Sequence, residues 1–240
     1  MYVMEIKLKP LSELLFRQMA KSNVEWFTYP FIPPTTMSGF IGELVGGESL
    51  ISKKYVEIND GRFRTLPEGV YSLGGIPEIY EKNKHFRQHY RAKGTYNYES
   101  LVWEGNKKLA QVEYFYSSKI LAYLISENKE VLKRIEDKIK YKCNNIGKIG
   151  VVKIRNTKVK KLKKEEEYEG EVSTLFPVEI AKKYDLNKMY EVPLFCYSSS
   201  EDETINWGVI PCSFHEEIRD DCYQVDDIII PKSLIDYVKK

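Results

Sequence analysis

The chain has 240 residues and a formal net charge of +2 at pH 7, with 42% hydrophobic and 30% charged residues, which is typical of a globular protein with one large or two small domains. No apolar run reaches the ~18 residues needed to cross a bilayer, and the N-terminus lacks an apolar signal region, so we expect a cytoplasmic protein. The four cysteines form no CxxC pair, which argues against a disulfide framework and a zinc ribbon.

Charge is distributed unevenly along the chain. Residues 148–164 contain many basic residues and no acid, whereas residues 201–227 contain many acids and one basic residue, Arg219. This asymmetry indicates one surface for a polyanion and another for a different kind of partner. The 18 tyrosines can stack on bases or contribute to protein interfaces.

The first predicted elements are a strand and a short helix. Alternating apolar residues predict the strand at Tyr2–Leu8. Residues 26–47, WFTYPFIPPTTMSGFIGELVGG, then contain an aromatic segment that two prolines keep extended. Thr35 and Thr36 are predicted to cap a helix that ends at the following Gly-Gly pair. Its apolar face has helical spacing and comprises Met37, Phe40, Ile41, Leu44 and Val45.

The opposite face of this predicted helix contains Gly39 and Gly42. Each glycine costs ~0.5–1 kcal/mol in a helix, so we expect another backbone, either a neighbouring strand or a nucleic acid, to come close. The first-turn amides and hydroxyls also suit an anion. The candidate RNA contacts in this part of the chain are Arg17, Tyr29, Thr35, Thr36, Ser38 and Gly39.

Residues 52–108 are predicted to be an irregular insertion. They contain turn signals such as Gly74-Gly75, with short strands expected at Tyr55–Ile58 and Val70–Leu73. Within the insertion, residues 80–98 mix basic and aromatic side chains in a predicted hairpin, a combination that suits single-stranded nucleic acid. The candidate RNA contacts here are Lys84, Arg87, Arg91 and Lys93.

Two strands, a helix and a third strand complete the N-terminal part. The strands are expected at Leu109–Tyr116 and Ile120–Ile125, and Asn128 is expected to cap a helix that runs to about Tyr141. The loop Gly147-Lys148-Ile149-Gly150 leads into a basic strand that slips in phase near Asn156, which suggests a bulge. This loop can hold phosphate or be a simple turn. Its candidate RNA contacts are Lys148, Lys153 and Arg155.

The C-terminal part is expected to be a small β-rich module. Residues 165–171 are acidic and are interpreted as a linker. Short apolar runs at Ser173–Ile180, Tyr190–Tyr197, Ile205–Pro211 and Ile228–Pro231 follow, separated by turn and acid clusters. A zinc site at Cys212, His215 and Cys222 lacks a fourth ligand, so no metal is expected.

These elements predict an α+β protein. Residues 1–164 are assigned to a ferredoxin-like (RRM-type) domain with a basic hairpin inserted at about 52–108, and residues 165–240 to the β-rich module.

The run TYPFIPPTTMSGFIGELVGG resembles the N-terminal signature of the CRISPR-associated RAMP-superfamily proteins of Cas family five. The order of elements from about Leu109 to Val159 resembles the end of the N-terminal domain in the same family. The resemblance implies a subunit of a type I Cascade complex that binds the 5′ handle of crRNA, needs no cofactor and supports antiviral defence. It also implies contacts with the backbone subunits and the large subunit, and an indirect association with target DNA.

An alternative remains open, because one branch of this family resembles a metal-independent endoribonuclease with a tyrosine, a lysine and a histidine. Here those residue types are available at His85 or His89, Lys84, and Tyr29 or Tyr90. The two histidines would share a face if they lay on a helix. The sequence also does not separate this chain from the related capping subunit of type III complexes.

Overall fold

A computed structural model describes residues 1–18, 25–46, 66–90, 96–97, 102–103, 107–147, 150–183, 189–198 and 205–239. It describes the backbone alone for residues 25–26, 83–90, 96–97, 102–103, 107–111, 195–198 and 205–207. None of the helices found in these ranges has the length and apolar character needed to span a membrane.

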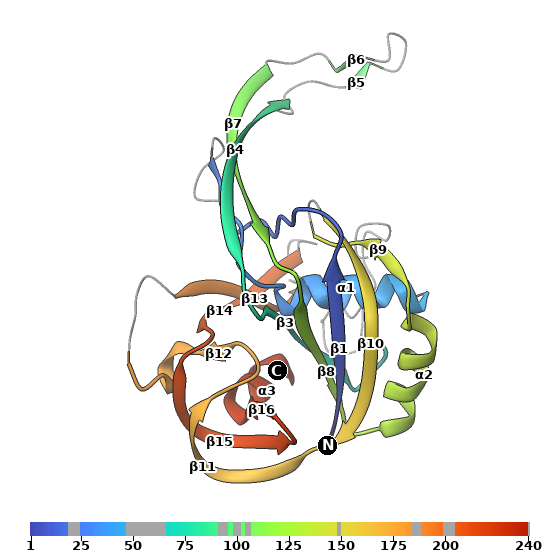
Figure 1. Ribbon diagram of the computed structural model, residues 1–240, viewed down its shortest axis with the longest axis vertical. Coiled ribbons are helices and arrows are strands. Elements are labelled where there is room, and N and C mark those ends of the chain that lie inside the picture. Colours follow the sequence, from blue (N-terminus) through green and yellow to red (C-terminus); the bar gives the residue numbers. More distant parts are fainter. Residues whose placement is uncertain are drawn as a thin grey trace.

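A five-stranded antiparallel sheet organises the N-terminal part of the chain (Figure 1). Helix α1 (Pro34–Val45) lies between the first and second strands of this sheet in the chain, and α2 (Lys129–Ile139) between the third and fourth. The resulting order of strand, helix, strand, strand, helix and strand is ferredoxin-like, which confirms the predicted fold class. Across the sheet the strands are β3 (Val70–Pro77), β8 (Ile120–Ser126), β1 (Tyr2–Pro10), β10 (Val151–Lys161) and β9 (Cys143–Asn145).

The second strand of this arrangement is β3, so its predicted position at Leu109–Tyr116 is wrong. Strand β3 pairs with β8 through a shift in register between Ser72 and Gly75. Gly74 has a φ of 77°, and a Cβ atom there would lie 2.5 Å from the carbonyl oxygen of Ile32. The glycine pair, which signals a turn in the sequence, therefore forms a bulge within a strand and lets Ile32 bridge to Gly75.

Helix α1 packs the predicted apolar face into the core, where Met37, Phe40, Ile41 and Leu44 are buried. The predicted threonine cap is wrong, because Pro33 occupies the N-cap position and no side chain caps the helix. The C-terminal end follows the prediction, since Gly46 adopts the left-handed conformation with a φ of 84°.

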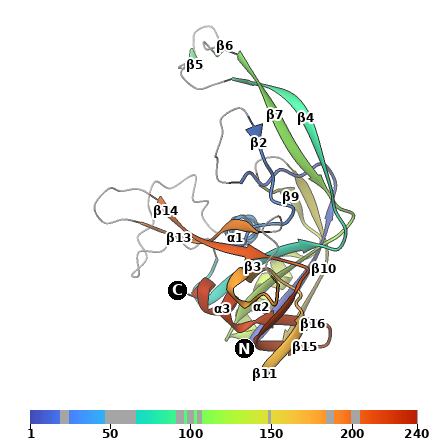
Figure 2. The same ribbon diagram turned by 90° about the vertical axis from the view of Figure 1, so that its left-hand side faces the viewer.

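Helix α2 begins as predicted, with the side-chain oxygen of Asn128 accepting hydrogen bonds from the backbone N–H groups of Glu130 and Val131. Leu132, Ile135 and Ile139 form its buried stripe. Both helices lie on the same face of the sheet (Figures 1 and 2). We call the opposite side the helix-free face.

A long arm projects from the body of the molecule between β3 and β8 in the chain (Figures 1 and 2). It consists of β4 (Glu81–Tyr90) and β7 (Lys107–Tyr116), which pair antiparallel along their whole length. The short pair β5 (Tyr96–Asn97) and β6 (Val102–Trp103) lies beyond them, and β2 (Glu25–Trp26) pairs parallel with β7. The strand expected at Tyr55–Ile58 lies outside the described residues.

The C-terminal part contains two small sheets, and the predicted linker is one of their strands. Acidic residues 165–171 belong to β11 (Lys163–Glu171), which pairs with β15 (Glu217–Val225), a strand that the sequence pattern missed. Cross-strand partners stabilise this acidic strand, since Lys164 pairs with Asp221 on β15. The remaining elements are β12 (Phe176–Pro177), a 3-10 turn (Val178–Ile180), β13 (Tyr190–Ser198), β14 (Ile205–Ser213), β16 (Ile228–Pro231) and α3 (Lys232–Lys239).

Apolar contacts cross from the ferredoxin-like sheet to the C-terminal part. Phe31 packs edge-on against Tyr190 and Phe214, with ring centroids 5.3 and 5.4 Å apart. Leu175, Val192 and Leu234 belong to the same buried cluster as residues of β1. The division at residues 164 and 165 stays a prediction, and the buried cluster extends across it.

Candidate nucleic-acid interface

The helix-free face of the sheet contains several lysines on its central strands. Side chains alternate along a strand, so Lys7 and Lys9 lie on the side opposite to the buried Ile6 and Leu8. In the register between β1 and β10, Lys9 lies opposite Lys153. Two like charges at opposed positions repel each other, and a bound anion would relieve that repulsion.

Three of these lysines, Lys9, Lys153 and Lys158, define what we call the lysine row. Lys158 lies opposite Glu5 in the register, but Glu5 forms its ion pairs with Lys7 and Lys160, each at 3.2 Å. Among the side chains that the structure describes, none forms an ion pair with a member of the lysine row. Lys9 and Lys158 are exposed and Lys153 is half-buried, so their charges are available to a ligand.

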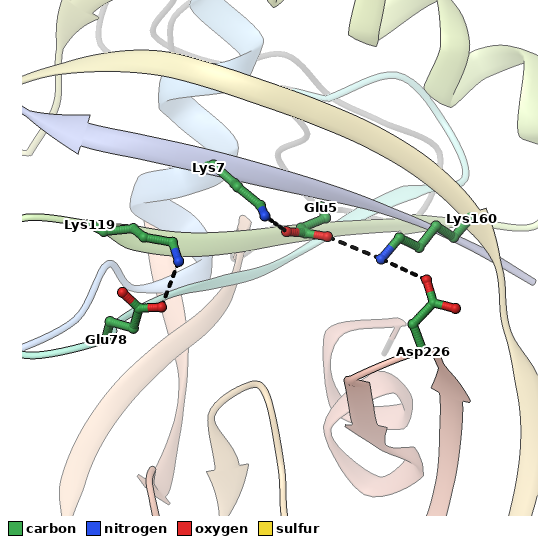
Figure 3. Close-up of polar contacts among 6 residues, drawn as sticks. All are labelled: Glu5, Lys7, Glu78, Lys119, Lys160 and Asp226. Carbon is green, nitrogen blue, oxygen red and sulfur yellow. Dashed lines mark hydrogen bonds and ion pairs between the residues drawn. The ribbon is translucent and has the colours of Figure 1, made fainter.

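Lys160 forms ion pairs within the protein. It contacts Glu5 at 3.2 Å and Asp226 at 3.1 Å, and so connects β1 and β10 to the turn between β15 and β16 (Figure 3). Burial lowers the pKa of Lys160, but hydrogen bonds to Asp226 and Glu5 outweigh this effect and hold the pKa above its ordinary value. Lys160 is therefore charged and already paired.

A polar pocket of ≈ 180 Å³ lies beside these residues. Lys7, Lys158 and Lys160 face Glu5 and Asp227 around it. Because Lys7 and Lys160 are paired with Glu5, Lys158 is the lysine of the pocket that no described acid neutralises. The pocket thus extends the basic character of the lysine row without forming an anion site of its own.

The predicted contacts on the basic strand lie on or next to the lysine row. Lys153 belongs to it, and Arg155 is exposed at the bulge, where the partner of β1 changes from Asn156 to Ile154. The phase slip read from the sequence is therefore a real bulge. Arg17 is half-buried and pairs through its backbone with Thr28.

The open face of α1 lies on the other side of the sheet. Thr36, Ser38 and Gly39 are partly exposed there. Apart from neighbouring residues and backbone of the same helix, no described atom lies within 4 Å of the position that a Cβ of Gly39 would occupy. Close packing inside the described part of the chain therefore does not explain Gly39. The structure divides the predicted contacts between two faces (Figure 2), so a single straight strand of RNA cannot meet α1 and the lysine row together.

Two predicted contacts serve the fold instead. Tyr29 is 2% exposed, and its hydroxyl donates a hydrogen bond to the carbonyl oxygen of Glu191. Thr35 donates its hydroxyl to the carbonyl oxygen of Pro193 at 3.1 Å. Both residues attach the proline-containing segment to β13, and the RNA-contacting or catalytic role of Tyr29 stays a prediction.

The histidines of the arm lie on a strand and not on a helix. His85 and His89 occur on β4, in register with Val112 and Lys108. Positions four apart on a strand are separated by about 13 Å, too far to share a metal ion. The side chains of Lys84, His85, Arg87 and His89 lie outside the described part of the structure, as do residues Arg91, Lys93 and Lys148 altogether.

The two glycines of the Gly-Lys-Ile-Gly loop are explained by packing. A Cβ on Gly147 would lie 2.5 Å from the ring of Phe16, and one on Gly150 would lie 2.5 Å from a methyl carbon of Leu14. Both glycines also have positive φ angles, of 68° and 150°. The loop was predicted either to hold phosphate or to be a simple turn. A simple turn packed against Leu14 and Phe16 accounts for both glycines.

No metal centre is found among the described histidine, cysteine and acidic residues. Cys212 and Cys222 are buried in different apolar clusters, and burial raises the pKa of both thiols, that of Cys222 to about 12. His215 has its Nε2 atom 2.9 Å from the carbonyl oxygen of Pro77. Packing in the core accounts for the two cysteines, and the contact with Pro77 accounts for His215.

The sequence did not single out Lys7, Lys9 and Lys158 as members of the interface. A signal was available, because MYVMEIKLKP alternates apolar residues with Glu5, Lys7 and Lys9. The pairing of this polar side with the basic side of β10 appears only in the sheet register.

Comparisons with known proteins find a similar fold among solved structures. No protein-family model and no curated protein matches the chain. A chain from the cryo-EM structure of the type III-B Cmr-beta bound to cognate target RNA has a TM-score of 0.50 and 12% identity, with 98% of this chain and 88% of that chain covered. Because the identity is so low, this likeness establishes a shared fold and nothing further.

Two other solved structures are similar at lower scores. A CRISPR protein from Archaeoglobus fulgidus has a TM-score of 0.45 and 14% identity, with 96% of this chain and 98% of that chain covered. A chain of a CRISPR RNA-guided surveillance complex has a TM-score of 0.41 and 9% identity, with 100% and 99% covered.

Proposed function

We propose that this protein is an RNA-binding subunit of a CRISPR effector complex. More narrowly, we assign it the role of the Cas family five subunit of a type I complex, which holds the 5′ handle of crRNA and caps the backbone. Its partners are then crRNA, the backbone subunits and the large subunit, with target DNA reached through the assembled complex. The proposal places the protein inside the cell.

The lysine row is the observation that carries this proposal. Lys9, Lys153 and Lys158 present positive charge on adjacent strands, and no described acid is paired with them. Such a surface binds phosphates and releases their counterions, which makes the affinity depend strongly on salt. The ferredoxin-like sheet fixes the spacing of these lysines, so they are held in place before a ligand arrives.

Two further observations support the assignment to CRISPR complexes. The run TYPFIPPTTMSGFIGELVGG resembles the signature of Cas family five. A solved structure with a TM-score of 0.50 is described as a type III-B Cmr-beta bound to cognate target RNA. The choice of a type I complex rests on the sequence resemblance.

In the endoribonuclease alternative, the candidate Tyr29 is buried and bonded to Glu191. Tyr90, Lys84 and the arm histidines remain candidates for a cleavage site. Incubation of repeat RNA with purified protein and EDTA tests this alternative. Specific cleavage that is lost in His85→Ala and His89→Ala would replace the non-catalytic role with an enzymatic one.

The test of RNA binding is the triple variant Lys9→Ala, Lys153→Ala and Lys158→Ala. Each lost phosphate contact should reduce the slope of log K against log salt concentration by about 0.7, so the triple variant should lose about 2 in slope. We expect its affinity for a single-stranded RNA at moderate salt to fall at least about tenfold. Filter binding across a salt series measures both quantities.

A matched control removes three positive charges elsewhere, through Lys129→Ala, Arg134→Ala and Lys183→Ala. These residues are exposed and lie on α2 and in the C-terminal part. The control should keep the wild-type slope. Equal slopes in both triple variants would show that the lysine row does not bind RNA.

A further inference from the structure

A groove of ≈ 490 Å³ lies at the base of the arm, where β1 ends and the arm begins. It is lined by three segments: Pro10–Glu13 at the end of β1, Ile79–Glu81 at the start of β4, and Tyr116–Ser118 at the end of β7. We call it the arm-base groove.

The strand pairing explains why a groove forms here. The end of β7 lies between two neighbours: Leu14 bridges to Phe115 on one edge, and Glu81 pairs with Tyr116 on the other. Tyr116 therefore contributes the floor, and the flanking segments form the walls. The Tyr116 hydroxyl donates a 2.5 Å hydrogen bond to Glu13, which fixes one wall to the floor.

Apolar side chains are exposed on both walls of the groove. Leu11 is 52% exposed on one wall, and Ile79 and Tyr80 are 76% and 36% exposed on the other. The ring of Tyr80 is held against Phe115 and Phe214, at centroid distances of 6.5 and 5.9 Å. Exposed apolar residues that converge on one concave site are typical of an interaction surface.

The charged residues of the groove are acidic. Glu13 and Glu81 line it, none of the lysines and arginines that the structure describes does, and Glu78 lies next to it in an ion pair with Lys119 (Figure 3). Tyr80 and Tyr116 could stack on bases, but two carboxylates repel a phosphate backbone. A partner with positive charge beside its apolar side chains complements this surface.

We propose that the arm-base groove docks a polypeptide segment of another protein, with apolar side chains inserted between Leu11 and Ile79 and an adjacent Lys or Arg paired with Glu81. The groove is large enough for a few side chains and is partly preformed by the Tyr116–Glu13 hydrogen bond. No member of the lysine row lines the groove, although Pro10 directly follows Lys9, and this inference does not depend on RNA binding.

The test places a photocrosslinker in the groove of the intact protein, in cells that express it with its native partners. The variant Ile79→p-benzoylphenylalanine should form a crosslink to a defined polypeptide segment that contains apolar residues next to a Lys or Arg. Tyr141 is 62% exposed on another part of the surface, and the same crosslinker at Tyr141 is the control. Mass spectrometry of the crosslinked peptides identifies the segment.

Charge reversal then distinguishes a specific docking site from a surface that binds polypeptides nonspecifically. Glu81→Lys should reduce the crosslink yield at least about fivefold, and exchange of the basic residue in the captured segment for Glu should restore it. Glu68→Lys, at an exposed turn, should have no effect.

Four outcomes would overturn the docking site: crosslinks to RNA, a yield no higher than at Tyr141, a captured segment without a basic residue, or a yield insensitive to Glu81→Lys. None of them affects the salt dependence measured with the lysine-row variant, so the two proposals fail independently.

Discussion

At the scale of single residues, the structure distinguishes side chains that stabilise the fold from exposed positions that can contact a ligand. Tyr29 and Thr35 have residue types that suit RNA, yet their hydroxyls bond to carbonyl oxygens of β13. Apart from its own helix, Gly39 has no described atom within 4 Å of the place where a Cβ atom would lie, although a glycine in a helix costs stability. The residue type alone did not distinguish these situations, because the distinction depends on what lies opposite each side chain.

Gly39 yields a prediction that separates folding from binding. Gly39→Ala should raise the free energy of unfolding by about 0.5–1 kcal/mol, because alanine is the better helix former and the added methyl meets nothing described. Gly39→Leu should also fold, but it should lose RNA if an RNA backbone passes over this face. Urea unfolding and the RNA that co-purifies with each variant measure the two effects.

Asp137→Leu, on the exposed side of α2, is a suitable control for the added apolar bulk. If the Gly39→Leu protein retains as much RNA as the wild type, no nucleic-acid backbone approaches this position.

At the scale of elements, local signals located helices better than they paired strands. The Asn128 cap, the buried stripe of α2 and the Gly46 terminus of α1 all agree with the prediction, because each depends on contacts within a few residues. The strand predicted at Leu109–Tyr116 is β7, but it pairs with β4 in the arm and does not belong to the five-stranded sheet. Alternation identifies a strand without identifying its neighbour.

The cap of α2 can be tested directly. Asn128→Ala should lower the free energy of unfolding by about 1 kcal/mol, since the N–H groups of Glu130 and Val131 would lose their side-chain acceptor. Asn128→Asp should retain most of the stability, because a carboxylate also accepts from these groups and suits the helix dipole. A urea denaturation series compares the variants. Equal stability of Asn128→Ala and wild type would show that the cap contributes nothing.

At the scale of the whole molecule, apolar and ionic contacts join the ferredoxin-like sheet to the C-terminal part. Phe31 packs against Tyr190 and Phe214, and Lys160 connects Glu5 on β1 to Asp226 on the far turn. Asp226, one of the acidic C-terminal residues, thus has a structural role next to a basic sheet. Lys9, Lys153 and Lys158 lie outside this ionic network and keep their charge for a ligand.

The Lys160 contacts predict a pH-dependent contribution to stability. Lys160→Met should lower the free energy of unfolding by about 1–3 kcal/mol at neutral pH. The reason is that the buried carboxylate of Glu5 would lose one of its two ion pairs and retain only the pair with Lys7. The pKa of Lys160 is raised in the folded protein, where bonds to Asp226 and Glu5 outweigh the effect of burial. The stabilisation is therefore complete below the pKa of an unfolded lysine and is lost as the pH rises through the folded pKa.

Urea unfolding at several pH values should show a constant difference between wild type and Lys160→Met up to about pH 10, and a smaller one above it. Lys158→Met is the control, since Lys158 has no ion pair among the described residues. A loss of stability in the control equal to that of Lys160→Met would mean that the ionic contacts are not responsible.

The sequence by itself determined the class of fold, both helices of the ferredoxin-like domain, the bulge in the basic strand and the presence of a basic surface. These features follow from the periodicity, capping residues and charge found within short stretches of the sequence. Only the tertiary structure decided that β3 is the second strand of the sheet, that Tyr29 is buried, and that Lys9 lies beside Lys153 while α1 lies on the opposite face. Strand partners and burial depend on contacts between residues far apart in the chain, and a pattern of neighbouring residues does not encode them.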